Sequence, residues 1–242
     1  MIAKQHAPLL ITAMLMAGAQ FAQAQVTIGP RVGLNLATVS GDTEFDGFEA
    51  DPKMILAPQV GVTLNAQFGN LALQPSLLFS QKGFKVEEEI SGVEDGEVYS
   101  ASVKGNMRLN YLEIPVNLVY NTSGEEGGFQ IFAGPYVGIG LGGKAKTEVD
   151  FSGGGSSFNV SESTNVKFAN QDDANSDQQF VRQPDFGANF GLGYKAGPFQ
   201  VQAGYSLGLS NLIPDSADGS EPEAKLRNRV VQVSLNYFFG GK

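Results

Sequence analysis

The chain has 242 residues, a formal net charge of −9 and no cysteine, and apolar residues make up 42% of it. The missing cysteine excludes a disulfide framework, thiolate chemistry and a cysteine metal site. The negative charge argues against nucleic acid as a partner, because a surface that binds nucleic acid has to neutralise phosphates.

The first predicted element is a secretory signal peptide over residues 1–24, which export would remove. Lys4 precedes an apolar stretch from Ala7 to Phe21, and the segment ends in the small-residue site Ala22-Gln23-Ala24. No other apolar stretch reaches the roughly 20 residues that a helix needs to span a bilayer. We therefore expect an exported chain without a helical membrane span.

Residues 25–242 are predicted to form one all-β domain with eight strands. In each strand segment every second residue is apolar, which is the pattern of a strand with one apolar face. The opposite faces carry glycine and small polar residues, such as Gln200, Gln202 and Ser206. In chain order the apolar faces run over Ile28–Leu36, Val60–Ala66, Leu71–Phe79, Leu112–Leu118, Ile131–Leu141, Phe186–Leu192, Phe199–Leu209 and Val231–Phe239.

The polar faces favour a membrane barrel over a soluble barrel or sandwich. They almost lack Lys and Glu, so they suit a narrow lumen better than a solvated exterior. The connectors also alternate between short turns and long acidic segments, as outer-membrane barrels require. The long connectors are residues 40–53, 85–104, 143–177 and 211–225.

These patterns predict an eight-stranded antiparallel up-and-down transmembrane β-barrel with long extracellular loops and short periplasmic turns. Both termini would then lie on the periplasmic side. An aromatic girdle is expected at that interface, because aromatic residues of lipid-facing parity end the strands there. They are Phe68, Tyr120, Phe129, Tyr194, Phe199, Tyr237 and Phe239.

The sequence also resembles the PorT-like outer-membrane β-barrel family of Bacteroidetes over nearly all of residues 25–242. The matching stretches are Gly29–Leu36, Gln74–Phe84, Tyr111–Leu118, Phe132–Gly138 and Val231–Phe239. The resemblance implies a porin-like barrel in the outer membrane, with no assigned activity for most members. PorT itself is associated with type IX secretion, but fold does not carry that role over. Tyr237 and Phe239 resemble the terminal aromatic signal read by the barrel assembly machinery.

Catalysis, a metal site and a cofactor are not expected. The only histidine, His6, lies in the predicted signal peptide, so the exported chain lacks the commonest general base. Acidic runs at Glu87, Glu88 and Glu89 and at Asp172 and Asp173 are typical of solvated loops. The pattern Asp42-x-Glu44-x-Asp46-Gly47 alternates acids as a calcium loop does, but it lacks the downstream bidentate Glu, and surface charge is the preferred interpretation.

Strand parity places Arg31, Glu113, Asp185 and Lys195 in the lumen. Charges in a narrow interior of low dielectric are expected to pair. They could form a structural network that fills the barrel, or they could line a small pore. Because an eight-stranded barrel is about wide enough for side chains only, we favour a filled interior.

Basic residues of lipid-facing parity on the long-connector side are candidates for contact with lipopolysaccharide phosphates. They are Lys104, Arg108, Arg182, Lys225, Arg227 and Arg229. Ordinary solvated strand ends are the alternative interpretation.

For the function, we expect a structural or surface-interaction barrel whose acidic extracellular loops contact an unknown partner. A small-solute channel, an accessory barrel of a secretion system and a soluble periplasmic carrier are the alternatives. The expected surroundings are outer-membrane lipid and, during biogenesis, the barrel assembly machinery.

Overall fold

The computed structural model describes residues 25–42, 44–45, 48–49, 51–94, 97–173, 176 and 178–240. The predicted signal peptide lies outside this described part of the chain. Within the described ranges, no helix has the length and apolar character needed to cross a membrane. The elements are β1 (Gln25–Gly41), β2 (Glu44–Phe45), β3 (Phe48–Glu49), β4 (Ile55–Phe68), β5 (Leu71–Glu94), β6 (Glu97–Asn121), the 3-10 helix η1 (Gly124–Glu126), β7 (Gly127–Gly153), β8 (Ser156–Phe168), β9 (Gln179–Val181), β10 (Pro184–Ala196), β11 (Phe199–Gly208) and β12 (Leu226–Tyr237).

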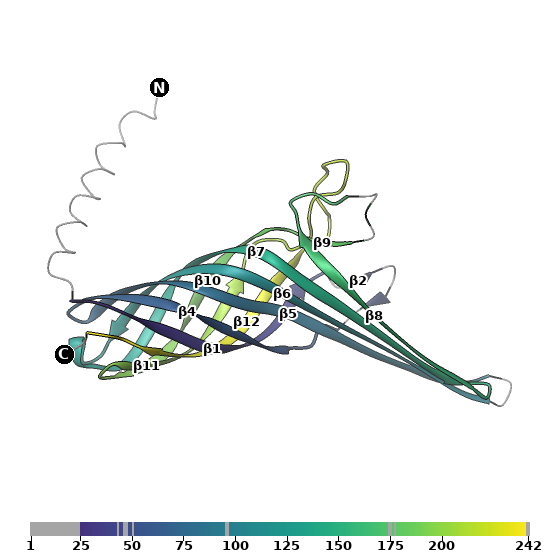
Figure 1. Cartoon of the computed structure of the whole chain (residues 1–242), viewed down its shortest axis with the longest axis horizontal. Helices are drawn as coiled ribbons and strands as arrows, with labels where there is room; N and C mark the ends of the chain where they lie inside the picture. The colour runs from purple at the N-terminus through teal and green to yellow at the C-terminus, as the bar shows by residue number, and fades with distance from the viewer. Residues whose placement is uncertain are drawn as a thin grey trace, which may run out of the picture.

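Eight of the described strands form a closed ring (Figure 1). The order runs β1-β4-β5-β6-β7-β10-β11-β12, and β12 pairs with β1 to close it. Every neighbouring pair in the ring is antiparallel. The prediction of an all-β ring of eight strands is therefore confirmed.

The alternation along each strand gives the ring an apolar exterior and a polar interior. On β12, Val233 and Leu235 are exposed, whereas Gln232, Ser234 and Asn236, which alternate with them, are buried. The same inversion holds on β1, where Leu34 and Leu36 face outward. A soluble protein buries its large apolar side chains, so this exterior needs an apolar environment around it.

Tight turns close the end of the ring where β1 begins and β12 ends (Figure 1). Gly69 joins β4 to β5 with φ 57°, and Gly197 joins β10 to β11 with φ 55°. Both values lie in the left-handed region that glycine adopts without steric cost. These turns match the short connectors predicted from sequence.

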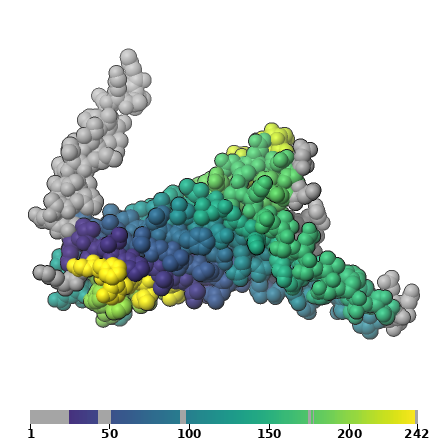
Figure 2. Space-filling view, in the orientation of Figure 1, coloured from purple at the N-terminus to yellow at the C-terminus, as the bar shows by residue number. Residues whose placement is uncertain are grey.

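Two of the long connectors are not loops in the structure. Residues 85–94 and 97–104 form the ends of β5 and β6, and residues 143–168 belong to the β7–β8 hairpin. Together they form a four-stranded extension beyond the ring, which we call the arm and define as residues 85–94, 97–104 and 143–166 (Figure 1). In the space-filling view the arm narrows away from the barrel (Figure 2). In the connector 143–177 the Gly153-Gly-Gly-Ser-Ser run indicates a tip with possible hairpin extensions on either side, and the structure has a hairpin there. The strand extensions over residues 85–94 and 97–104 differ from the acidic connector that the sequence predicts.

A β-bulge lies where β6 and β7 leave the ring. The β6–β7 register shifts between Asn110 and Tyr111, which pair with Gly142 and Gly140. Leu141 is the extra residue, so the side chains of β7 change faces at this point. Ile139 faces outward before the bulge and Lys144 faces outward after it.

Candidate functional site

The lumen contains a buried charge cluster centred on Lys82 of β5. Its Nζ lies 2.5 Å from Glu113 Oε2 and 3.0 Å from Asp185 Oδ2. Nζ also lies over the Tyr136 ring, 4.3 Å from its centroid. The three charged side chains are at most 5% exposed, so each charge depends on the others for the stabilisation that water would otherwise supply.

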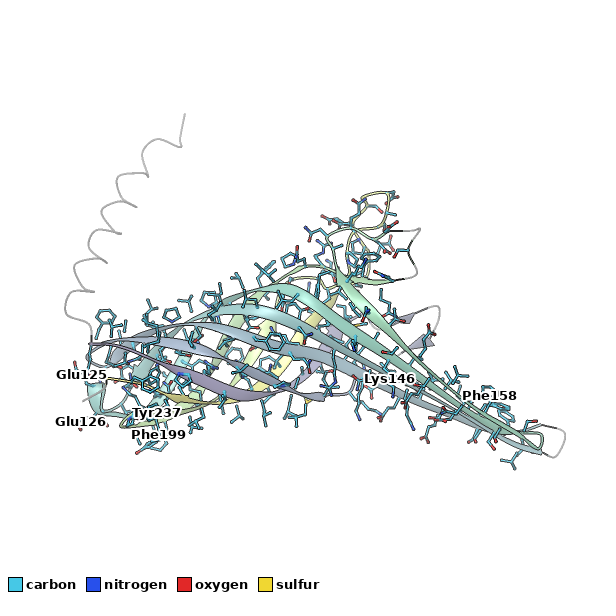
Figure 3. The ribbon with its side chains drawn as sticks, in the orientation of Figure 1. Glu125, Glu126, Lys146, Phe158, Phe199 and Tyr237 are labelled. Atoms are coloured by element: carbon cyan, nitrogen blue, oxygen red, sulfur yellow. The ribbon has the colours of Figure 1, made fainter. Side chains whose placement is uncertain are left out.

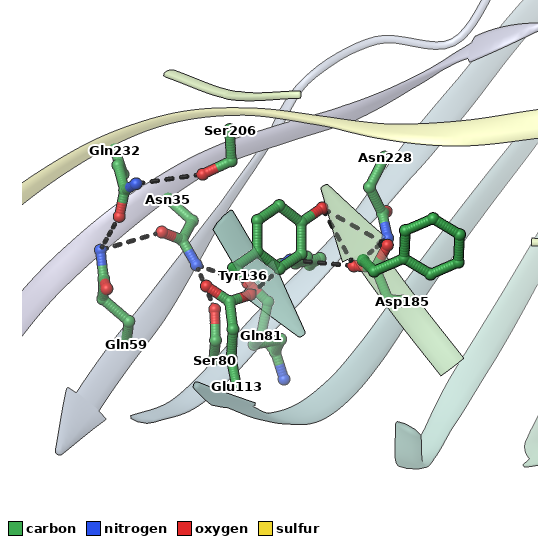
Figure 4. A network of polar contacts seen from close by, with 12 residues as sticks. Asn35, Gln59, Ser80, Gln81, Glu113, Tyr136, Asp185, Ser206, Asn228 and Gln232 are labelled. Atoms are coloured by element: carbon green, nitrogen blue, oxygen red, sulfur yellow. Dashed lines mark hydrogen bonds and ion pairs between the residues drawn. The ribbon is translucent and has the colours of Figure 1, made fainter. Parts of the chain in front are cut away.

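Asp185 of β10 is held by three further donors, of which Figure 4 labels Asn228 and Tyr136. Ser210 Oγ donates to its carboxylate at 2.9 Å, Asn228 Nδ2 at 3.0 Å and the Tyr136 hydroxyl at 3.4 Å. A carboxylate with this many donors has its lone pairs satisfied, which is the condition for a buried charge to be tolerated.

Polar amides fill the lumen next to this cluster. Gln59 Nε2 donates to Asn35 Oδ1 and to Gln232 Oε1, and Gln232 donates onward to Ser206 (Figure 4). Arg31 joins this ladder, because its Nη2 donates to Gln232 Oε1 at 3.3 Å. The ladder links four neighbouring strands of the ring, β4, β1, β12 and β11.

The structure brings together two of the four predicted lumenal charges, Glu113 and Asp185. Arg31 is lumenal and buried but bonds to an amide. Lys195 is half-buried at the end of the ring beside the turns, where it lines a pocket with Glu125 and Glu126. It is therefore not part of the charge cluster.

Lys82 itself is absent from the lumenal charges predicted from sequence. The predicted strand ends at Phe79, but β5 continues to Glu94. If the predicted strand is extended by three residues beyond Phe79, Lys82 falls on the same lumen-facing side as Ser80.

An apolar cap closes the lumen between the charge cluster and the arm. It combines residues of β1, β6, β7, β8, β9 and β12 with Leu212 from the segment before β12, and all of its core members are at most 9% exposed. The cap consists of Val39, Leu109, Tyr111, Ala145, Val166, Val181, Leu212 and Leu226. Tyr111 joins the two layers, because its ring packs edge-on against Phe168 and also lies near Lys82 Nζ.

The lumenal glycines make room for aromatic rings and do not leave open space. A Cβ added at Gly191 or at Gly204 would lie 2.7 Å from the Phe132 ring, and one at Gly140 would lie 2.1 Å from the Phe168 ring. Large side chains from one strand thus occupy the volume that glycine leaves free on another.

The exterior carries the predicted aromatic residues at the end with the tight turns. Tyr237 contacts both Phe199 and Phe239 edge-on, and Phe129 contacts Tyr194 in the same way. Phe129 is 71% exposed and Tyr194 is 50% exposed. Figure 3 shows Phe199 and Tyr237 at the end of the barrel opposite the arm.

The six basic residues predicted to contact lipopolysaccharide do not form one cluster. Lys104 and Arg108 lie on β6, and Arg227 and Arg229 lie on β12. Arg182 pairs with Asp215, and Lys225 lies in the segment before β12, where its backbone N–H donates to Asp42. Arg229 Nη1 donates to the carbonyl oxygens of Gly208 and Asn228.

The arm is an amphipathic sheet. Ile90, Ala101, Phe151 and Phe158 pair in one row across its four strands, and Val103, Val149 and Val160 pair in the next row, which Glu88 of β5 completes. We call the seven apolar residues of these rows the apolar face of the arm. Phe151 and Phe158 stack at 5.1 Å, yet Ile90, Phe158 and Val160 remain more than half exposed. The opposite face carries the row Glu89, Ser102, Asp150 and Asn159.

The candidate acidic residues are placed on the surface. Glu87 pairs with Lys53 and Lys85, and Asp172 and Asp173 lie exposed in the segment between β8 and β9. Asp46 and Gly47 of the possible calcium loop fall outside the described residues. Among the residues that the structure describes, no group of three or more His, Cys, Asp or Glu side chains could hold a metal ion.

The model of the family described as "Outer membrane protein beta-barrel domain" matches residues 21–214. No curated protein matches the chain. Among solved structures, Ail of Yersinia pestis in complex with the heparin analogue sucrose octasulfate is 14% identical, with 88% of this chain and 99% of that chain covered and a TM-score of 0.38. Neisserial surface protein A is 10% identical, with 87% and 96% covered and a TM-score of 0.36. The translocator domain of the autotransporter NalP from Neisseria meningitidis is 13% identical, with 97% and 99% covered and a TM-score of 0.26. These TM-scores are too low to support an inference about this chain.

Proposed function

The chain belongs to the outer membrane protein beta-barrel domain family, and on that premise we propose that it is a closed transmembrane barrel that acts through its arm. The barrel spans the outer membrane with its termini in the periplasm, and the arm projects from the cell. The protein has a surface-interaction role and no catalytic one. The narrower assignment to the PorT-like family of Bacteroidetes is part of this proposal and rests on the sequence stretches given above.

The observation that carries the proposal is the apolar face of the arm. Its seven residues lie on the lumen-facing side of strands that have left the barrel. Four of them, Ile90, Val103, Phe158 and Val160, are 42–57% exposed, and the other three are partly buried. An exposed apolar sheet face outside a membrane costs solubility unless a partner buries it. The charged opposite face keeps the arm soluble on the other side.

A photo-crosslinking experiment on intact cells tests this role. A photoreactive amino acid at Phe158 or Val160, on the apolar face, is expected to crosslink to a partner at the cell surface. The same group at Asn159 or Ser161 is the matched control, because these neighbours on β8 point to the polar face. Equal crosslinking from both faces, or none from either, would contradict the proposed contact surface.

The orientation can be checked with single cysteines, because the chain has none of its own. We expect Ser157→Cys in the arm to react with a membrane-impermeant maleimide on intact cells. Thr122→Cys, in the turn between β6 and β7, should react only after the outer membrane is opened. The reverse pattern would place the arm in the periplasm.

If the apolar exterior faces lipid, a charged side chain placed on it should strongly lower the free energy of unfolding. Val233→Arg should lower the free energy of unfolding by about 2–4 kcal/mol in lipid, the cost of Arg on the lipid face near the bilayer midplane. Ser161→Arg, on the polar face of the arm, should change it little. Urea unfolding in vesicles of phosphatidylcholine measures both, and equal effects would count against a lipid-facing Val233.

A further inference from the structure

Two like charges face each other at the edge of the apolar exterior. Arg108 of β6 and Lys144 of β7 are direct cross-strand partners, and both are directed outward. Exposed apolar residues follow on the barrel side of the pair: Leu112 lies four residues along β6, beyond Asn110, Leu141 lies at the bulge of β7, and Leu56 lies on β4. The pair therefore lies where the apolar surface of the barrel gives way to the polar face of the arm.

The pair lacks a compensating acid. Like charges directly opposite each other in a sheet are destabilising. Among the described residues, the ion pairs on this side of the molecule are Lys53–Glu87, Lys85–Glu87 and Lys146–Glu148, and none of them includes Arg108 or Lys144.

The acidic side chains near this pair already form ion pairs with other lysines. Hydrogen bonds from Lys85 and then from Lys53 lower the pKa of the Glu87 carboxyl below its ordinary value. Glu148 is held by Lys146. The charge of Arg108 and Lys144 is thus left for a ligand from outside the chain.

The Arg108 guanidinium is positioned in advance. Its Nη1 donates to Gln81 Oε1 at 2.9 Å and to the Leu56 carbonyl oxygen at 3.2 Å. These contacts hold the guanidinium of Arg108 at the edge of the apolar surface. The Arg108 side chain therefore loses less conformational entropy when it binds an anion. A fixed guanidinium beside a flexible ammonium is a combination suited to phosphate.

We propose that Arg108 and Lys144 bind the phosphate of a phosphorylated glycolipid in the outer leaflet, with its acyl chains against Leu56, Leu112 and Leu141. This proposal rests on the membrane orientation proposed above. The apolar neighbours favour a lipid over a free anion, because they offer a surface for acyl chains next to the charged pair.

The site differs from the set of basic residues expected from sequence. It keeps Arg108 and adds Lys144, which the bulge at Leu141 turns outward. Arg182 is balanced by Asp215, and Arg227 and Arg229 lie on β12, away from β6 and β7 in the ring order. They are not part of this site.

The test uses protein purified from outer membranes in detergent and transferred to phosphatidylcholine nanodiscs containing bisphosphorylated lipid A. Native mass spectrometry measures the lipid A retained. The double variant Arg108→Gln/Lys144→Gln should lose affinity about tenfold or more, because it removes both positive charges that hydrogen-bond to the phosphate. Lys195→Gln/Lys225→Gln removes two positive charges elsewhere and should retain lipid A as the unmodified protein does.

Lys144→Glu separates binding from structure. The new carboxylate should pair with Arg108, so the barrel should unfold at a higher temperature while lipid A binding falls. Unchanged lipid A retention in the Arg108→Gln/Lys144→Gln protein would overturn the proposal. So would binding of inorganic pyrophosphate with no preference for lipid A, which would indicate a free-anion site. A protein that fails to enter phosphatidylcholine nanodiscs at all would instead refute the membrane placement.

Discussion

Replacing Lys82 by Met is expected to lower the free energy of unfolding by about 3–5 kcal/mol, the usual cost of removing one partner from a buried ion pair. The substitution leaves Glu113 and Asp185 as two carboxylates in the same enclosed space. Met fills nearly the same volume as the Lys side chain, so the loss reports on charge and not on a cavity. Urea unfolding of the protein in lipid vesicles, followed by the heat-shifted band on a gel, measures the change.

The triple variant Lys82→Met/Glu113→Gln/Asp185→Asn is the matched control. It removes all three charges while keeping the side-chain shapes, and a neutral replacement of a whole buried ion network is often tolerated. We expect it to recover most of the stability that the single variant loses. If the triple variant were as unstable as Lys82→Met alone, the cluster would contribute through packing and not through charge balance.

The second large effect concerns conductance. Protein with its native sequence is expected to show no steady openings in planar bilayers, because the charge cluster, the amide ladder and the apolar cap fill the lumen. Tyr111→Ala/Tyr136→Ala removes the two rings on either side of Lys82 and should produce discrete ion-conducting events. Single-channel recording of both proteins, after a heat-shift gel has confirmed folding, makes the measurement.

Two tyrosines on the exterior supply the comparison. Tyr194 and Tyr205 both point outward, so Tyr194→Ala/Tyr205→Ala deletes the same atoms without opening the lumen. This protein should remain silent. Steady openings from the unmodified protein would show that the lumen conducts. Arg31 and Glu113 would then be the expected lining of the pore.

The barrel could be predicted from sequence because a strand in a membrane ring has two faces with opposite demands. Val233 and Gln232 differ by one position, and their parity alone gives their faces, as long as the strand continues without interruption. The same rule places Arg31, Glu113 and Asp185 inside. It could also have placed Lys82, had the predicted strand not been ended where charged residues become frequent.

The charged pair at the edge of the barrel could not be predicted in this way. Lys144 follows the bulge at Leu141, which reverses the parity of β7. Gly140, Gly142 and Gly143 are a signal for a bulge in this stretch, but they do not say which residue is the extra one. The pairing of Lys144 with Arg108 cannot be predicted from sequence either, because it depends on the register between β6 and β7. Parity is a local property of one strand, whereas a bulge and a register depend on two.

The arm is built from the same strands as the barrel, and this continuity bears on the thermodynamics of recognition. A flexible loop has to give up its conformational freedom when it binds, and that loss subtracts from the affinity. β5, β6 and β7 continue from the ring into the arm without a break, so Ile90, Phe151 and Phe158 are held in one row before any partner arrives. Most of the ordering entropy is therefore lost when the barrel folds, and a small apolar contact could give useful affinity.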